Sequence, residues 1–139
     1  MAPEGYSNGV VAGGRQVFIA GQIGWSERGE LVSEDFVAQA ERALANIVEV
    51  LAEAGGEPRH LTRLTWFAID KAVYVVRQKE IGEAYRRVLG RHFPAMTRIV
   101  VAGLLGQGAK VEIEGRPLFR LTKVLDRDRA LEVRILPGF

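Results

Sequence analysis

The clearest pattern of apolar positions along the chain is helical and begins at residue 36. Apolar side chains recur there at intervals of three and four residues, at Phe36, Ala40, Leu44, Ile47, Leu51 and Ala54. That spacing predicts an amphipathic helix of about five turns with one apolar stripe. Residues 33–35 supply a hydroxyl and two carboxyl groups for its N-terminus, and the glycine pair at residues 55–56 is typical of a helix C-terminus.

A second helix is predicted between Asp70 and Gly90. Asp70 is a suitable N-cap, and one apolar stripe follows it, formed by Ile81, Ala84, Tyr85, Val88 and Leu89. The sequence His-Phe-Pro at residues 92–94 then breaks the helical pattern, because proline disfavours helical geometry in the residue before it.

Four segments have the composition of β-structure. Residues 10–25 contain two β-branched and aromatic runs separated by two glycines, which predicts a hairpin. Residues 61–69 are rich in strand formers, and two further strands are expected at residues 97–104 and 110–118. The order ββ, α, β, α, β, β indicates an α+β domain in which both helices cover one face of a sheet.

Chain length and the position of this pattern suggest one domain with an extension. A chain of 139 residues can bury a core without disulfides or metal ions, and the pattern accounts for residues 1–118. Residues 119–139 form a C-terminal extension, for which we expect a strand or a hairpin around residues 126–129, packed on the same domain.

Composition excludes several classes of function. Cysteine is absent, and residues 1–118 carry 14 basic and 14 acidic side chains, so neither a thiolate site nor a basic nucleic-acid-binding face is expected. No apolar run reaches the roughly 18 residues of a membrane span, and we see no export signal. We therefore expect a cytoplasmic protein that binds neither nucleic acid nor membrane.

Local motifs for metal or nucleotide chemistry are also missing from the sequence. His60 and His92 lack the spacing of a local metal pair, and the glycines at residues 103–108 lack the context of a phosphate-binding loop. We expect no metal and no organic cofactor.

The sequence Val-Glu-Ile-Glu-Gly at residues 111–115 is a candidate for chemistry. Strand alternation places Glu112 and Glu114 on one face and Val111 and Ile113 on the other. The two carboxylates either meet water on the polar face of a sheet, or one of them is partly desolvated at a subunit junction and holds a water molecule or moves a proton.

Several of these segments, taken in order, resemble the Rid family of reactive intermediate imine/enamine deaminases, also called YjgF-like or endoribonuclease L-PSP-like proteins. The resemblance covers roughly residues 5–118, which is most of the chain. Its carriers are Tyr6-Ser7, FIAGQIG at 18–24, the first helix with Gln39 and Asn46 and its AGG end, LTWFAID at 64–70, the helix with Tyr85, HFPA at 92–95 and GAKVEIEG at 108–115. It implies a chorismate-mutase-like (bacillus type) fold with a mixed sheet, and a homotrimer with clefts between its subunits.

The same resemblance implies residue roles. Deaminases of this family hydrolyse 2-imino or 2-amino-alkenoate acids without a cofactor, and Glu112 matches the residue that orients the attacking water. Tyr6 would wall the cleft, and Gly21 and Gln22 would lie on its inner strand. The family signature Pro-Ala-Arg, whose arginine pairs with the substrate carboxylate, is Pro-Ala-Met here, with Met96 at the anchoring position.

Two residues near the expected cleft bear on the ligand. Arg98 faces the same side of a regular strand as Met96, but it is displaced by about 6 to 7 Å. It either binds the ligand or forms a surface or intersubunit ion pair. Trp25 directly follows the GQIG sequence and suggests an apolar rim of the cleft. Trp25 and Met96 together favour a ligand that is less acidic and more apolar or aromatic than a short imino acid.

The sequence alone leaves three hypotheses about function open. The first is a Rid-like hydrolase of an imine, enamine or related carbon–nitrogen compound, with Glu112 positioning water. The second is a non-catalytic trimer that binds a small metabolite and has lost the deaminase anchor. The third is a ribonuclease or translation inhibitor, which the balanced charge disfavours.

Overall fold

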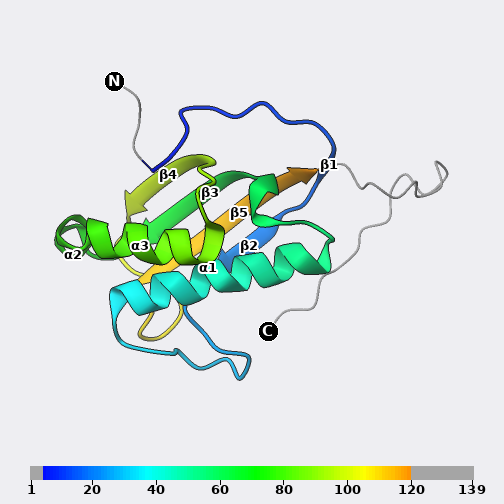
Figure 1. The fold of residues 1–139 in the computed structure, drawn as a ribbon. Coiled ribbons are helices and arrows are strands. Elements are labelled where there is room, and N and C mark those ends of the chain that lie inside the picture. Colours follow the sequence, from blue (N-terminus) through cyan, green and yellow to red (C-terminus); the bar gives the residue numbers. More distant parts are fainter. Residues whose placement is uncertain (1–4, 120–139) are drawn as a thin grey trace.

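The computed structural model describes residues 5–119, which form a mixed β-sheet with helices on one of its faces (Figure 1). Its strands, in chain order, are β1 (Arg15–Gln16), β2 (Ile19–Gln22), β3 (Leu61–Ala68), β4 (Ala95–Val100) and β5 (Val111–Phe119). Strand β3 lies between β4, which is parallel to it, and β5, which is antiparallel. The predicted α+β class is confirmed, and the sheet is mixed.

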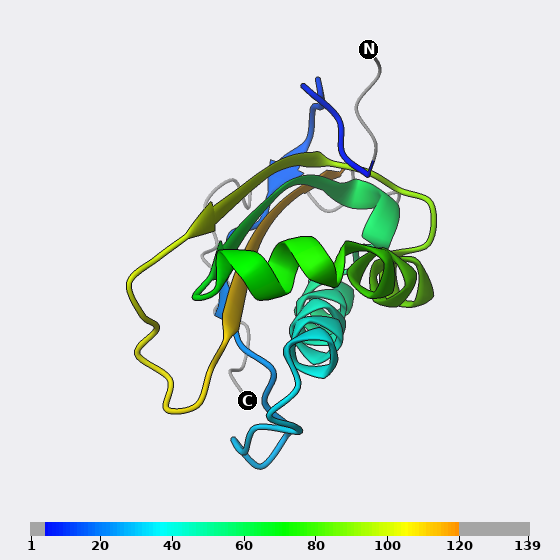
Figure 2. The same cartoon turned by 90° about the vertical axis from the view of Figure 1, so that its left-hand side faces the viewer.

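Helices cover only one face of this sheet (Figure 2). They are α1 (Phe36–Glu53), the short 3-10 helix η1 (Pro58–His60), α2 (Lys71–Val76) and α3 (Gln78–Leu89). Alternate residues of β3 and β5 are buried against them, namely Leu64, Trp66, Ala68, Val111 and Ile113. The residues between these, which include Phe67, Glu112 and Glu114, lie on the opposite face, which no helix of the described part of the chain covers. We call the two sides the helix face and the open face.

The first predicted helix is confirmed with nearly the expected bounds. Asp35 caps α1, because its carboxylate accepts a hydrogen bond of 3.0 Å from the backbone N–H of Ala38. Gly55, at a positive φ of 82°, ends the helix, and the N–H of Gly56 donates to the carbonyl of Leu51. The helix buries its apolar stripe, including Ala40, under the sheet.

The hairpin predicted within residues 10–25 is wrong. Strands β1 and β2 do not pair with each other; both pair with β5 and follow one another along its outer edge. Val11 is fully exposed in the loop before them, whereas Ile19 is buried in the core. Pairing with the long strand β5 brings Ile19 under the helix layer, which an isolated two-stranded hairpin does not provide.

The second predicted helix is divided into α2 and α3 at Arg77. Asp70 caps α2 as expected, and Gly90 ends α3 with a positive φ of 67°. The predicted end of the helix at Gly90, before the His-Phe-Pro sequence, is therefore confirmed. The β-branched residues Val75 and Val76 precede the break and lower helix propensity there.

The last two strands differ from their predicted bounds. Strand β4 begins two residues before the predicted residue 97 and stops at Val100, because its partner β3 ends at Ala68 and offers no further backbone groups. Strand β5 includes Phe119, one residue beyond the predicted domain boundary. The rest of the expected C-terminal extension, residues 120–139, lies outside the described residues.

Candidate ligand-binding site

Met96 and Arg98 both lie on the helix face of the edge strand β4. Their partners on β3 are Leu64 and Trp66, which are buried beneath the helices. Because laterally paired residues point to the same side of a sheet, Met96 and Arg98 point to that side as well. The prediction that Arg98 shares a face with Met96 is confirmed.

Tyr6 is brought to the same edge by the segment before the first strand. The neighbouring Ser7 forms a parallel bridge with Ala95, its N–H donates to the carbonyl of Pro94 at 3.0 Å, and its hydroxyl donates to the carbonyl of Phe93 at 2.6 Å. Ser7 therefore shares the side of Ala95, and alternation puts Tyr6 on the side of Met96. The conspicuous Tyr-Ser pair of the sequence thus fixes a half-buried tyrosine beside β4.

The guanidinium group of Arg98 lies between two tyrosine rings. Its central carbon is 5.3 Å from the ring centroid of Tyr6 and 5.8 Å from that of Tyr74, and its Nη1 donates to the Tyr74 hydroxyl at 3.0 Å. Tyr74 is in turn held edge-on against Phe36, at 6.0 Å, and Trp66, at 6.4 Å. We call Tyr6, Tyr74 and Arg98 the Arg98 cluster.

Glu112 lies on the other side of the sheet. Its lateral partner is Phe67, and both side chains are half-buried on the open face. The Glu112 carboxyl group lies over the backbone of Gly21: a Cβ atom at position 21 would be 1.9 Å from Glu112 Oε1. Gly21 is therefore required for this position of the carboxylate, which gives the predicted inner-strand glycine a physical role.

Gln22 and Trp25 hold the segment that follows. Gln22 pairs with Ile113 and donates to the carbonyl of Ala20 at 3.2 Å. The carbonyl of Trp25 accepts hydrogen bonds from Arg42 Nε at 3.0 Å and from Asn46 Nδ2 at 3.1 Å. The bonds to Trp25 tie this segment to α1, and neither residue contacts the Arg98 cluster.

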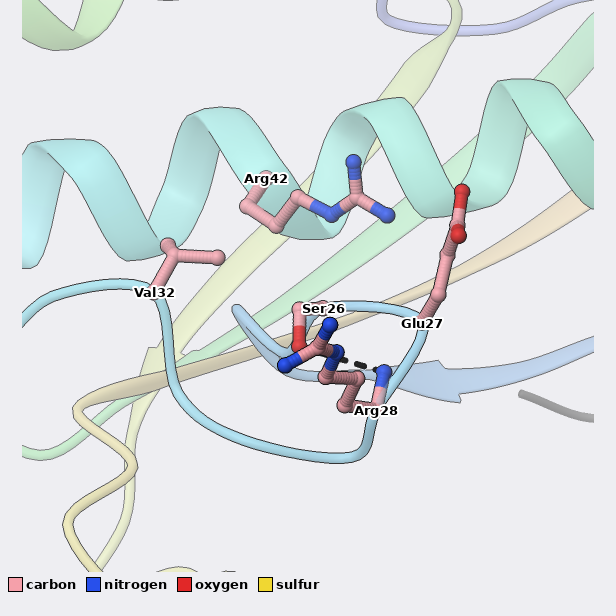
Figure 3. Close-up of a pocket in the computed structure, with 5 residues that line it drawn as sticks. All are labelled: Ser26, Glu27, Arg28, Val32 and Arg42. Atoms are coloured by element: carbon pink, nitrogen blue, oxygen red, sulfur yellow. Dashed lines mark hydrogen bonds between the residues drawn. The ribbon is translucent and has the colours of Figure 1, made fainter.

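A shallow hollow lies directly after Trp25, between this loop and α1 (Figure 3). It has a volume of about 230 Å³ and is lined by Ser26, Glu27, Arg28, Val32 and Arg42. None of the residues predicted for the site lines it. Arg42 is already bound to the carbonyl of Trp25 and lies 3.6 Å from a carboxylate oxygen of Glu49.

The predicted site residues therefore fall into two groups within one chain. Tyr6, Met96 and Arg98 lie on the helix face, whereas Glu112, above Gly21, lies on the open face. A β-sheet separates the two groups, so one copy of the chain does not bring Glu112 to the guanidinium of Arg98. A cleft that contains both needs two copies.

Sequence reasoning missed Tyr74, and it gave no role to Gln39 and Asn46. Tyr74 follows a helix cap and has no motif of its own. Gln39 and Asn46 are fully buried in the apolar stripe of α1, where they hold the backbone of surrounding loops. Their position on an apolar helix stripe could have predicted this role, because a buried side-chain amide needs hydrogen-bond partners.

Residues 5–119 contain neither a cluster of metal ligands nor a membrane-spanning helix. No group of three or more histidine, cysteine or acidic side chains in residues 5–119 is placed to hold a metal ion. No helix in that range combines the length and the apolar character needed to cross a bilayer.

Comparison with known proteins places these features in a family. The model of the family described as "Endoribonuclease L-PSP" matches residues 1–116. This chain belongs to that family, the Rid or YjgF-like proteins. It is 36% identical to the protein DfrA of Myxococcus xanthus over 111 residues, which are 78% of this chain and 81% of the relative.

Two further relatives bear on function and fold. The 2-iminobutanoate/2-iminopropanoate deaminase of Homo sapiens is 32% identical over 110 residues, covering 78% of this chain and 76% of the human protein. The solved structure of the Rid protein YyfB from Yersinia pestis superimposes with a TM-score of 0.75 at 30% identity, covering 86% of this chain and 96% of that one. The predicted family and its α+β fold are thus confirmed.

Proposed function

We propose that this protein is a Rid-type hydrolase of an imine, an enamine or a related carbon–nitrogen compound. Family membership and the deaminase activity named for the human relative support this reaction class. The observation that carries the proposal is the half-buried Glu112 carboxylate, seated over the Gly21 backbone on the open face. A carboxylate in that position can orient water next to an electrophilic carbon.

The assembly in this proposal is a homotrimer of chorismate-mutase-like subunits with a site in each cleft between neighbours. One copy supplies Tyr6, Met96 and Arg98 from the helix face of its β4 edge. The neighbour supplies Gly21 and Glu112, with Trp25 at the rim. The separation of these groups onto two faces of one sheet supports such a shared cleft, because closed symmetric assemblies place different surfaces of two copies together.

The chemistry requires one water molecule and no cofactor. Glu112 accepts a hydrogen bond from the water and takes its proton as the oxygen attacks the C=N carbon. Glu112 returns this proton to the nitrogen, the hydroxyl group of the tetrahedral intermediate gives up its own proton, and the nitrogen leaves as ammonia while the carbonyl product forms. An enamine reaches the same path after protonation at carbon gives the iminium ion.

The experiment compares the parent protein with Glu112→Gln in an imine hydrolysis assay with semicarbazide as the competing trap. The substrates are 2-iminopropanoate and the imine of an aromatic amino acid, both formed in place by an amino-acid oxidase. Loss of the general base should lower kcat by about a hundredfold or more, while the neutral amide keeps the shape of the side chain. Equal turnover by parent and variant would contradict this role of Glu112.

The second candidate is a non-catalytic trimer that binds a small metabolite in the same cleft. Met96, which stands where the family signature has arginine, is the observation that favours it. No turnover of either imine by the parent, together with saturable binding of small acids, would support the binder. RNA cleavage remains the disfavoured third candidate, because basic and acidic residues are balanced over residues 1–118.

A further inference from the structure

The Arg98 cluster combines two cation–π contacts with a hydrogen bond, and the proposed reaction chemistry assigns no role to these contacts. The Arg98 side chain is exposed, and no carboxylate of residues 5–119 forms an ion pair with it. Its guanidinium is nevertheless held by two rings and a hydroxyl group. A long, exposed arginine side chain normally samples many rotamers, and these contacts restrict it. The result is a fixed cation without a carboxylate partner among residues 5–119.

The position of this cation agrees with the vacated anchor. Tyr6 lies beside the start of β4, because its neighbour Ser7 pairs with Ala95. The guanidinium of Arg98, from further along the strand, still comes within 5.3 Å of the Tyr6 ring centroid. The two side chains thus meet on the helix face at the β4 edge, and Met96 points to the same face of the same strand.

Tyr74 gives the guanidinium its orientation. The Tyr74 hydroxyl accepts a hydrogen bond from one N–H of Arg98. Edge-to-face contacts with Phe36 and the buried Trp66 restrict the tyrosine ring. A guanidinium has five N–H donors in a rigid plane, so one bond to Tyr74 leaves a free edge for a second acceptor. The geometry suits the two oxygens of a carboxylate.

We infer that Arg98 is the carboxylate anchor of this chain and that Tyr74 is the positioning residue that aims it. Met96 beside the anchor adds an apolar, half-buried surface. The ligand class is therefore a monocarboxylic acid with an apolar or aromatic body. The assignment of this acid to a hydrolytic reaction rests on the proposed function, whereas the binding step is measured independently of turnover.

The test is calorimetric titration of the whole protein with 3-phenylpropanoate and with its neutral isostere 3-phenylpropanamide. Arg98→Gln should weaken binding of the acid by about ten- to a hundredfold, and Tyr74→Phe by about three- to tenfold, because the variants lose charge-assisted bonds and their alignment, respectively. The neutral amide should bind the parent weakly and respond little to either variant. Arg98→Lys should restore only part of the acid affinity, since it keeps the charge but lacks the planar fork.

Arg86→Gln is the matched control. Arg86 is an exposed arginine on α3 that forms no ion pair with another described residue, so its loss removes the same charge from the protein without touching the cluster. It should leave acid binding unchanged. Unfolding midpoints of all variants verify that any loss of affinity is not a loss of folding.

The outcomes separate this inference from the proposed function. Equal binding of acid and amide, unchanged affinity in Arg98→Gln, an equal effect of Arg86→Gln, or binding of neither probe by the parent would each overturn the anchor. Acid binding that depends on Arg98 and Tyr74 in a protein with no imine turnover would keep the anchor and refute the hydrolase. In an active protein, the Tyr74→Phe change should raise KM for an imino acid more than it lowers kcat.

Discussion

At the scale of single residues, the position of the Glu112 carboxylate leaves no room for a side chain at position 21. A Cβ atom there would lie 1.9 Å from Oε1. The atom in conflict is the end of a flexible side chain, so Glu112 can move aside and the fold can persist. Gly21 therefore determines where the carboxylate lies.

Gly21→Ala should lower imine turnover by about tenfold or more with little change in the thermal midpoint, because a displaced base loses its alignment with water. The control is Gly13→Ala, where a Cβ atom meets nothing within 4 Å. Turnover and the unfolding midpoint are measured for both variants. Full activity in Gly21→Ala would show that the observed carboxylate position is not the working one.

At the scale of secondary-structure elements, Gln39 connects α1 with two loops. Its Nε2 donates to the carbonyls of Ser33, at 2.9 Å, and Gly108, at 3.1 Å, and its Oε1 accepts from the N–H of Lys110 at 2.8 Å. These bonds satisfy partly buried backbone groups just before α1 and β5. One amide side chain thereby holds the loop before α1 against the loop before the strand that carries Glu112.

Gln39→Ala should lower the free energy of unfolding by about 2 to 4 kcal/mol, since three backbone groups lose their partner and the loss of a fully buried side chain leaves a cavity. Urea denaturation of parent and variant measures the difference. Gln78→Ala, at an exposed position on α3, serves as the control and should change the free energy of unfolding by less than about 0.5 kcal/mol. A Gln39→Ala variant as stable as the control would contradict this role.

The short helix η1 introduces a pH dependence of stability. Burial, followed by the nearby Arg59 charge, holds the pKa of His60 below its usual value, with His92 acting in the same direction and Glu57 opposing it. His60 Nδ1 accepts a hydrogen bond of 2.9 Å from the N–H of Glu57, and its ring stacks on Phe119 at 4.8 Å. Both features favour the neutral imidazole.

Because the folded-state pKa of His60 is depressed, its contribution to stability is fully present above the unfolded pKa of about 6.5 and is lost as the pH falls through the lower folded value. The free energy of unfolding of the parent should therefore fall between neutral and mildly acidic pH by more than that of His60→Gln. Denaturation series at several pH values measure both slopes. Identical slopes would show that His60 does not titrate differently on folding.

The main elements were predictable from the sequence wherever local pattern and tertiary burial agree. The stripe from Phe36 to Leu51 suits only a helix packed on one side, so α1 matched closely. The hairpin prediction was wrong because the apolar sequence around Ile19 does not indicate which strand it pairs with. In the structure it pairs with the longer strand β5. The break at Arg77 follows the β-branched Val75 and Val76, and it coincides with ion pairs from Arg77 to Glu80 and to Asp35. Asp35 is distant in sequence, so its contact with Arg77 leaves no local signal.

The site was predictable in its residues but not in its arrangement. The family resemblance pointed to Glu112, Tyr6 and Met96, and alternation placed Arg98 beside Met96. The separation of Glu112 from Arg98 by the sheet required the pairing register of β3 with both neighbours. Tyr74 required the packing of α2 over Trp66, which no sequence spacing records.

At the scale of the whole molecule, the sheet has one face covered by helices and one open face (Figure 2). The open face carries half-buried Glu112 and Phe67, and Phe18 is 66% exposed near the opposite edge. An exposed sheet face with apolar side chains is typical of an interaction surface. This arrangement supports an assembly in which the open face of one copy meets the β4 edge of another.

The proposed site is shared by two copies, and mixing two impaired variants tests this arrangement at a substrate concentration well below KM. Glu112→Gln and Arg98→Gln are each prepared alone and then mixed in equal amounts, with exchange of subunits verified by native mass spectrometry of differently tagged chains. If each site takes Arg98 from one copy and Glu112 from its neighbour, random mixing restores about a quarter of the parent sites. Imine turnover near that fraction is the predicted result, and mixed oligomers no more active than either variant alone would contradict the shared site.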